Sequence, residues 1–149
     1  MKELQVGNIR VIFDKAQVAK SFDAVAVVLF SSGRLVFVRN KERAWEFPGG
    51  HRQGNESYEE TATRETYEEA QAKITDIEYL GYYISPTGHT TVIVCAEASS
   101  FRVFDGEYEI SEVGIFDRLP SPLSFGDGRE QLFVDHATRR RANRGIYVA

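Results

Sequence analysis

Apolar residues along the chain fall into short runs separated by glycine, proline and small polar residues, which is typical of a strand-rich domain. The longest run, Ala24–Phe30, is apolar throughout and predicts a strand buried on both faces. After a Ser-Ser-Gly-Arg turn, Leu35–Val38 predicts a second strand. Further strands are predicted over Ile77–Ile84, Thr90–Ala96 and Glu112–Phe116. The pattern therefore predicts a sheet with at least one strand covered on both faces.

Two helices are predicted, each by a capping box. In a capping box, a polar residue and a glutamate three positions later exchange hydrogen bonds with the backbone at the start of a helix. Ser57 and Glu60 have this spacing and predict a helix that begins at the next residue. Asp127 and Glu130 predict another helix, over residues 128–144. Together with the strands, the helices predict an α/β fold in which a mixed sheet has a helix on each side.

The weakly patterned residues 1–20 add only a short edge strand at Ile9–Phe13. At 149 residues the chain is long enough to bury a core, so one domain over 1–149 is expected. The single cysteine, Cys95, excludes an internal disulfide. The chain has no signal-peptide core, and its longest apolar run is too short to cross a bilayer. A cytoplasmic protein with no membrane partner is therefore expected.

The stretch from Gly49 to Ala72 is the candidate for chemistry, because it joins a glycine loop to a segment crowded with glutamates. Glu65, Glu68 and Glu69 stand at positions i, i+3 and i+4, which places three carboxylates on one helix face. Such a face repels itself unless it is solvated or holds a divalent cation that prefers oxygen ligands. Carboxylates and substrate phosphates are the usual ligands of Mg²⁺. Mg²⁺ is therefore the expected cofactor, with Mn²⁺ as the alternative.

Other polar residues belong to the same stretch. Arg64 lies four residues after Glu60 and four before Glu68, so it can pair with either. Glu56, at the end of the loop, can reach back toward Arg64 or the metal. The loop glycines let the backbone turn tightly and approach a ligand closely. The histidines of the chain show no zinc-ligand spacing, and His51 is the one that the sequence places near this chemistry.

The charged positions of this stretch resemble the box of the Nudix hydrolases. That pattern is a glycine, five residues, a glutamate, seven residues and then Arg-Glu-aliphatic-x-Glu-Glu-x-Gly-aliphatic. The matching residues are Gly50, Glu56, Arg64, Glu65, Glu68 and Glu69. Three uncharged positions depart from the pattern: Thr66 and Ala72 replace aliphatic residues, and Gln71 replaces the last glycine. A left-handed Gln71 would cost roughly 1 kcal/mol, unless the helix continues past it.

The resemblance implies the Nudix α/β/α sandwich with a central mixed sheet, and a Mg²⁺-dependent pyrophosphohydrolase. Its substrate would be a nucleoside diphosphate linked to another group, and water would attack a phosphorus of the diphosphate bridge. The implied metal ligands are Glu56, Glu65, Glu68, Glu69 and the backbone carbonyl of Gly50. Glu65 or Glu68 would take the proton of the water. Arg64 would hold the carboxylates in place.

Substrate contacts and a further base are sought outside the box helix. Arg39, at a strand end, can face a phosphate or only solvent, and Arg52, in the loop, is a second candidate. Trp45 stands in a Trp-Glu-Phe-Pro segment that also resembles the family. It either packs or lines a base pocket, whereas Phe47 is expected to pack. Some family members use a glutamate outside the box as the base, for which the candidates are Glu107, Glu109 and Glu112. An exposed acidic loop is the alternative for each.

Nucleoside triphosphates, including oxidised ones, are the leading substrate class, because they suit a compact domain without an added module. An ADP-sugar such as ADP-ribose is the alternative. Pro86 falls 15 residues after Gln71, where ADP-sugar members tend to carry a proline, although turns carry prolines anyway. A capped RNA 5′ end is a third option, supported only by the basic cluster Arg139–Arg144, which the helix dipole also explains.

The partners expected from the sequence are small molecules of the nucleotide type. A net charge of −4 does not favour a polymeric nucleic acid. A homodimer is expected only in so far as family members are often dimers. A nucleotide-sensing module without turnover is the alternative of another class. The complete set of box glutamates favours the enzyme.

Overall fold

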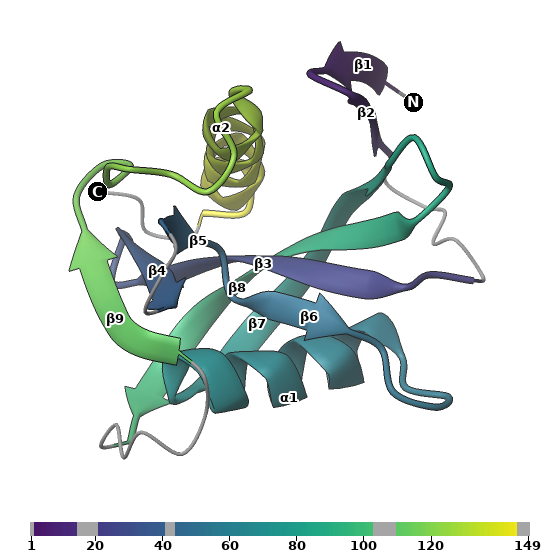
Figure 1. The fold of residues 1–149 in the computed structure, drawn as a ribbon. Helices are drawn as coiled ribbons and strands as arrows, with labels where there is room; N and C mark the ends of the chain where they lie inside the picture. Colours follow the sequence, from purple (N-terminus) through teal and green to yellow (C-terminus); the bar gives the residue numbers. More distant parts are fainter. Residues whose placement is uncertain (1, 15–20, 41–43, 103–109, 146–149) are drawn as a thin grey trace.

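The computed structural model describes residues 2–14, 21–40, 44–102 and 110–145. Within them the chain forms a nine-stranded sheet and two helices (Figure 1). The strands are β1 (Lys2–Val6), β2 (Ile9–Phe13), β3 (Ala24–Ser31), β4 (Arg34–Asn40), β5 (Trp45–Glu46), β6 (Gly49–His51), β7 (Ala72–Ile84), β8 (Thr90–Phe101) and β9 (Ile110–Phe116). The helices are α1 (Tyr58–Ala70) and α2 (Arg129–Asn143). Neither helix has the length and apolar character needed to cross a membrane.

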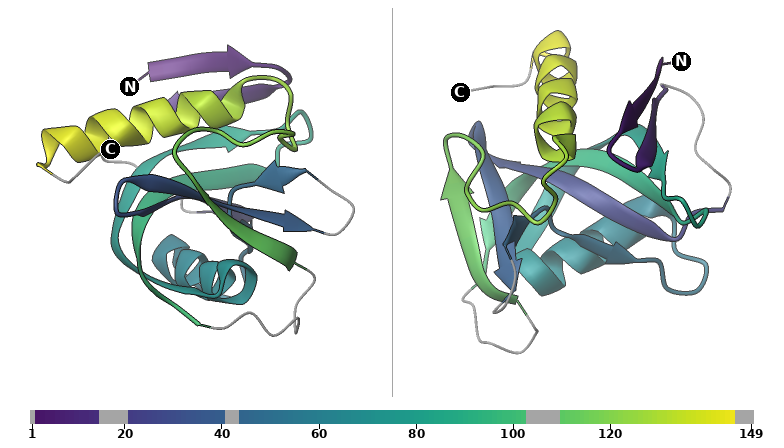
Figure 2. Two further views of the ribbon diagram at one scale, coloured as in Figure 1. Left: turned by 90° about the vertical axis from the view of Figure 1, so that its left-hand side faces the viewer. Right: turned by 45° about the horizontal axis from the view of Figure 1, so that its top comes forward.

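The sheet is mixed, and β3 lies near its centre. The strand order is β1-β2-β7-β8-β3-β4-β5, with β6 paired to β3 and β9 paired to β4. Strands β3 and β8 run parallel, and the other pairs are antiparallel. Helices α1 and α2 cover opposite faces of the sheet (Figures 1 and 2). The predicted mixed sheet with a helix on each side is therefore confirmed.

Strand β3 is buried on both faces, as its apolar run predicts. Val25 and Val27 pack in the cluster that includes Ala62 and Ala70 of α1. Val28 packs in the opposite cluster, which contains residues of α2. Each fully buried valine contributes about 1.5–3 kcal/mol relative to an exposed one. The strand thus provides a rigid base for β6, which pairs along its edge.

Helix α1 begins at Tyr58 with the predicted capping box. The Glu60 N–H donates to Ser57 Oγ at 3.1 Å, and the Ser57 N–H donates to the Glu60 carboxylate at 2.8 Å. At the other end, Gln71 adopts the left-handed conformation, with φ 57° and ψ 32°. The helix therefore ends where the family pattern has glycine, rather than continuing. The buried Gln71 amide donates to the Glu68 carbonyl at 2.9 Å, which offsets part of the conformational cost.

Helix α2 does not begin with the predicted capping box. Its N-cap is Gly128, with a φ of 91°, and a glycine has no side chain to accept a capping hydrogen bond. The Asp127 carboxylate instead accepts hydrogen bonds from the backbone N–H and the guanidinium of Arg129. The Glu130 carboxylate accepts from the backbone N–H of Phe125 at 3.0 Å. The prediction of a capping box was wrong. Asp127 and Glu130 have the required spacing, but Asp127 binds Arg129 and Glu130 binds the Phe125 N–H.

The arginines at the end of α2 tie this helix to the sheet. Arg140 and Arg144 both pair with Glu78 of β7, at 3.2 and 2.6 Å. The buried Arg141 pairs with Glu97 of β8 at 2.8 Å. These ion pairs, in addition to the helix dipole, account for the basic cluster. Much of its charge is neutralised within the fold, so the cluster gives little support to an RNA contact.

Several strands differ from their predicted positions or lengths; β8, for example, continues to Phe101 instead of ending at Ala96. Ile9–Phe13 forms a strand, but β1 pairs on its outer side, so it is not the edge of the sheet. Strand β7 begins at Ala72, five residues before the predicted start at Ile77. Its pairing with β8 shifts register at three places, and Asp76 has a φ of 55°. Such irregularities break the alternation by which a strand is recognised in a sequence.

Candidate active site

Strand β6 brings the glycine loop against α1. A Cβ at Gly50 would lie 2.4 Å from Glu65 Oε2, so any side chain there would overlap this carboxylate. The Gly49 N–H donates to Glu69 Oε1 at 2.7 Å. The two glycines therefore allow the backbone to approach two of the box carboxylates closely.

Arg64 is the centre of the charged residues on α1. Its Nε lies 2.7 Å from Glu56 Oε2, and its Nη2 lies 3.0 Å from Glu56 Oε1. Its Nη1 lies 2.8 Å from Glu65 Oε1 and 3.4 Å from Glu68 Oε2. Nη2 also donates to the His51 carbonyl at 2.8 Å. One guanidinium thus connects the glycine loop with three carboxylates of the box, and it holds Glu56 through the two-pronged contact that suits arginine.

Arg64 and burial shift the pKa values of the box carboxylates in opposite directions. Hydrogen bonds from the Arg64 guanidinium lower the pKa of Glu56 to about 2. Burial raises the pKa of Glu69 to about 8, and burial also raises the pKa of Glu65. A raised carboxyl pKa means that the charged form lacks sufficient compensation from solvent and neighbouring cations. Arg64 alone therefore does not balance the negative charge of this face.

The donor chemistry of the face fits a divalent cation. Among the described residues, no three His, Cys, Asp or Glu side chains converge closely enough to share a metal ion. Arg64 instead occupies the centre of the carboxylate cluster. The incompletely balanced carboxylates still supply the oxygen donors that Mg²⁺ prefers, beside a backbone strand that a side chain at Gly50 would obstruct. The residues that could hold the ion are Glu56, Glu65, Glu68, Glu69 and the Gly50 carbonyl.

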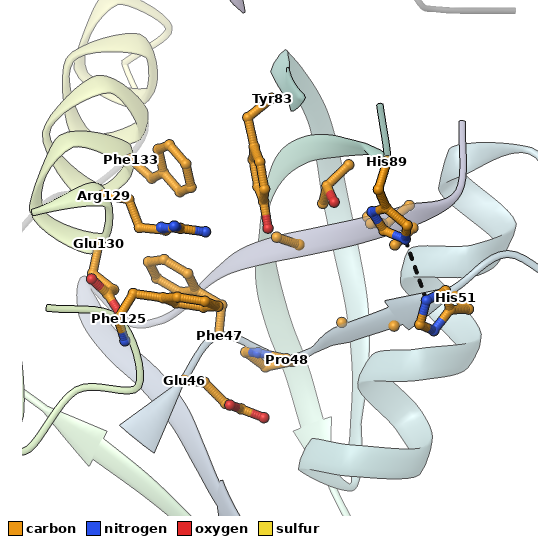
Figure 3. Close-up of a pocket in the computed structure, with 16 residues that line it drawn as sticks. Glu46, Phe47, Pro48, His51, Tyr83, His89, Phe125, Arg129, Glu130 and Phe133 are labelled. Carbon is orange, nitrogen blue, oxygen red and sulfur yellow. Dashed lines mark hydrogen bonds between the residues drawn. The ribbon is translucent and has the colours of Figure 1, made fainter. Parts of the chain in front are cut away.

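A pocket of about 310 Å³ lies beside β6, on the side of the sheet covered by α2 (Figure 3). Residues from β3, β5, β6, β7, β8, α2 and the connecting segments line it. They are Ala24, Val25, Ala26, Glu46, Phe47, Pro48, Gly49, Gly50, His51, Tyr83, His89, Thr91, Phe125, Arg129, Glu130 and Phe133. The volume lies at the lower end of the range for small-molecule sites.

Aromatic rings form much of the pocket wall near α2. Phe133 stacks on Phe47 with ring centroids 6.3 Å apart, and on Tyr83 with centroids 5.7 Å apart. The Arg129 guanidinium lies 3.9 Å from the ring centroid of Phe125. Flat apolar walls with a few polar groups at the edge are suited to a planar ligand such as a nucleobase.

Polar side chains mark the two ends of the pocket in Figure 3. At one end Glu130 is 1% exposed, and burial raises the pKa of its carboxyl group. At the other end the Nε2 atoms of His51 and His89 lie 3.4 Å apart. The sequence placed only His51 near the loop. His89 joins it because the turn between β7 and β8 folds back beside β6.

Three of the predicted substrate or base residues lie together away from the pocket. Arg39 forms an ion pair with Glu112, and its guanidinium lies 5.1 Å from the ring centroid of Trp45. Trp45 is 8% exposed and packs edge-on against a phenylalanine of β9. None of the three lines the pocket. The other base candidates, Glu107 and Glu109, lie outside the described residues.

Arg52 lies beside the box. Its Nε donates to the Glu56 carbonyl at 2.8 Å, and its guanidinium lies 4.6 Å from the ring centroid of Phe22. Arg52 is thus next to the residue that Arg64 holds most firmly. Of the two partners predicted for Arg64 on the helix, Glu68 is the one observed, because the Glu60 carboxylate caps the helix instead.

The α2 wall of the pocket was missed by the sequence analysis. The sequence gives Phe133 no role beyond an apolar position in the helix predicted over residues 128–144, and it gives Glu130 the role of a capping residue. No local signal separates these roles from pocket lining. Phe47 packs as predicted, 4.9 Å from Phe37 between ring centroids, and it also lines the pocket. Pro86, which favoured an ADP-sugar, lies in an exposed turn outside the pocket.

Comparison with known proteins defines the class of this chain. A model of the NUDIX domain matches residues 20–119, and the chain belongs to the Nudix family. Nudix hydrolases act on phosphorus-containing anhydrides, and they generally use divalent metals. The chain is therefore a member of a pyrophosphohydrolase family, as the box indicated.

Individual relatives show how far the likeness extends. YtkD of Bacillus subtilis (strain 168), provisionally named an 8-oxo-dGTP diphosphatase, is 29% identical over 127 residues, or 83% of this chain and 80% of that protein. The crystal structure of the B. subtilis pyrophosphohydrolase BsRppH matches with a TM-score of 0.82 at 23% identity, over 94% of this chain and 98% of that one. An ADP-ribose pyrophosphatase from Streptococcus suis matches with a TM-score of 0.60 at 20% identity, over 79% and 90%. These structures confirm the Nudix fold.

Proposed function

We propose that the protein is a Mg²⁺-dependent pyrophosphohydrolase that cleaves a nucleoside triphosphate into the monophosphate and pyrophosphate. The observation that carries this proposal is the position of β6 between the box carboxylates and an aromatic pocket. The Gly49 N–H binds Glu69, while Gly49 and Gly50 also line the pocket. A nucleobase in the pocket would therefore have its phosphates close to the loop and the box.

The box residues have distinct proposed roles in this reaction. The ion would be held by Glu56, Glu65, Glu68, Glu69 and the Gly50 carbonyl. A bound Mg²⁺ or Mn²⁺ neutralises charge on phosphate oxygens and orients water. Glu65 or Glu68 accepts a proton as the water oxygen bonds to phosphorus, and the bond from that phosphorus to the bridging oxygen breaks. Arg64 is a positioning residue, because it acts through the carboxylates that it holds.

Of the three substrate-binding candidates, Arg52 has the most favourable position, since it lies beside Glu56 of the box. Arg39 and Trp45 would contact only a part of the substrate that extends beyond the pocket. Glu112 would have to leave its ion pair with Arg39 to act as the base. Glu107 and Glu109 stay predictions for the same role.

The name of YtkD supports a triphosphate substrate, in particular an oxidised one. Hydrolysis of an ADP-sugar to AMP and a sugar phosphate is the second candidate, and the likeness to the S. suis ADP-ribose pyrophosphatase favours it. Nucleotide sensing without turnover is the alternative of another class. We place the reaction in the cytoplasm, because the substrates are nucleotides.

The test is hydrolysis of a substrate panel with Mg²⁺ or Mn²⁺, with the products separated. The panel contains ordinary and 8-oxo nucleoside triphosphates, ADP-ribose and ADP-glucose. Release of monophosphate and pyrophosphate is expected. AMP and a sugar phosphate, without triphosphate cleavage, would favour the second candidate. Failure to cleave any of them, with Mg²⁺ still bound, would favour the sensing module.

A double variant tests the metal site. Glu68→Gln with Glu69→Gln should abolish both Mg²⁺ binding and turnover, because amides are weaker ligands than carboxylates for this ion. Glu59→Gln, which changes an exposed glutamate of the same helix, is the matched control and should retain both. Turnover that survives in the double variant would refute the assignment.

A further inference from the structure

Two histidine side chains meet at the end of the pocket beside β6. His51, the last residue of β6, is exposed, and His89, directly before β8, is half-buried. Both line the pocket, and their Nε2 atoms lie 3.4 Å apart (Figure 3). This separation is long for a hydrogen bond from an N–H group, for which about 2.7–3.2 Å is usual. A hydrogen bond is therefore a weak reason for the two rings to face one another.

The two rings have the spacing of two ligands on one metal ion. Imidazole nitrogens bind Zn²⁺ at about 2.0–2.1 Å in tetrahedral geometry, which places two of them about 3.3–3.4 Å apart. With the ion in line with each Nε2 atom, the ring centroids would lie about 5.2–5.3 Å apart. The observed centroid distance is 5.4 Å, and the ring planes are nearly perpendicular, at 82°, so the rings do not stack. Both distances thus suit an ion shared between the two Nε2 atoms.

Backbone contacts at the start of β3 hold the two histidines next to each other. Asp23 contacts the residue that follows each histidine. Its carbonyl accepts from the Arg52 N–H at 2.9 Å, and its carboxylate accepts from the Thr90 N–H at 2.8 Å. The sheet backbone therefore brings His51 and His89 together, and ligands that are positioned in advance lose little freedom when they bind an ion.

We propose that His51 and His89 bind a transition-metal ion of the zinc class. Imidazole nitrogen suits Zn²⁺, Ni²⁺ and Cu²⁺, whereas Mg²⁺ prefers carboxylate and other oxygen ligands. The site uses different atoms from the box, because the His51 carbonyl binds Arg64 while the His51 ring lies at the pocket. This inference goes beyond the proposed function and does not depend on it, since the ion can bind whether or not a nucleotide is cleaved.

The proposed ion would have open coordination positions. In the stretches of chain that the structure describes, no Asp, Glu or Cys side chain completes a group of three ligands with the two histidines. The remaining positions of a tetrahedral ion would therefore be filled by water or by an oxygen of an anionic ligand, as in open zinc sites. Because both histidines line the pocket, a ligand in the pocket would be able to reach the ion.

Calorimetric titration with Zn²⁺ tests the site, on tag-free protein in excess Mg²⁺ at about pH 7.5, where free imidazole is largely neutral. The parent protein should bind Zn²⁺ under these conditions. His51→Gln and His89→Gln should each weaken this binding by about tenfold or more, because loss of even an outer contact to a metal ligand costs about 10–100-fold. Circular dichroism checks that each variant is folded.

Two controls separate the histidines from the box. His136→Gln removes the remaining histidine of the chain, which stacks on Phe13 and does not line the pocket. Glu68→Gln with Glu69→Gln removes box carboxylates and leaves both pocket histidines in place. Each control should retain the Zn²⁺ site.

Nuclear magnetic resonance of ¹⁵N-labelled protein gives a second readout. Zn²⁺ should shift the ring signals of two of the three histidines, and these should be the signals that disappear in His51→Gln and His89→Gln. A parent protein that binds no Zn²⁺ would overturn the inference. Binding that survives both histidine variants, or that is lost only in the box variant, would overturn it as well. None of these results affects the proposed hydrolysis, which is measured with Mg²⁺.

Discussion

Replacing Gly49 by alanine should destabilise the fold through the backbone of β6. The added Cβ would lie 2.1 Å from the Val25 carbonyl oxygen, about 1.3 Å short of the 3.4 Å at which ordinary contact begins. Relief requires that β6 move away from β3, because the obstacle is backbone and not a flexible side chain. That movement would also stretch the 2.7 Å hydrogen bond from the Gly49 N–H to Glu69.

The two effects give the expected magnitude. Overpacking of this kind costs about 1–3 kcal/mol, and the loss of a hydrogen bond to a carboxylate costs about 1.5–3 kcal/mol. The free energy of unfolding should therefore fall by about 2.5–6 kcal/mol. For a domain of this size the midpoint of thermal unfolding should fall by on the order of 10 °C. Turnover should fall as well, because β6 carries Gly50.

Thermal unfolding followed by circular dichroism, with initial rates on the best substrate, checks this prediction. Gly126→Ala is the control, since a Cβ at Gly126 would meet no atom within 4 Å. It should change the free energy of unfolding by less than about 0.5 kcal/mol. A Gly49→Ala protein with the parent's unfolding midpoint and activity would show that β6 can move away from β3 at little cost, and would refute the reasoning.

Three further predictions concern other parts of the chain. Arg64→Lys keeps the charge but loses the fork that binds both oxygens of Glu56, so the free energy of unfolding, measured in urea, should fall by about 1–3 kcal/mol; no change would contradict the central role of Arg64. Ser32→Asn should raise the free energy of unfolding by about 0.5–1 kcal/mol, because positive φ at Ser32 (50°) and Gly33 (82°) matches the type I′ turn that Asn-Gly favours. A loss of stability would contradict this. Arg129 lowers the pKa of Asp127 below its usual 3.8, so this carboxylate stabilises the fold above about pH 4, and the effect is lost as pH falls through the lowered pKa. Asp127→Asn should therefore be less stable than the parent at pH 7, by urea unfolding, with the difference shrinking toward pH 2; an equal difference at both pH values would contradict the assignment.

The box was predictable because its signals are local. The spacing of Glu65, Glu68 and Glu69 fixes their common helix face, and the Ser57–Glu60 capping box fixes where that helix begins. The buried strand β3 was equally clear, since burial on both faces leaves no polar position in the run. In each case the physical cause lies within a few residues along the chain.

The pocket was not predictable for the opposite reason. Its walls join segments as distant in sequence as Phe47, Tyr83 and Glu130, and only the sheet brings them together. Glu130 also gave a misleading local signal, because three-residue spacing from Asp127 is what a capping box requires. Strand β1 was not predicted, because its side chains from Glu3 to Val6 alternate between exposed and half-buried positions and so lack a strong apolar pattern.

The division of the site between α1 and α2 has a consequence for how the protein can change. The NUDIX match ends at residue 119, whereas α2 begins at Arg129. The carboxylates that would perform the hydrolysis and the side of the pocket formed by α2 thus belong to separate lengths of chain, and β6 lies between them. Substitutions in α2 can reshape the pocket without displacing any carboxylate of the box. The last helix is therefore the place where evolution or an engineer could exchange one substrate for another while the reaction stays the same.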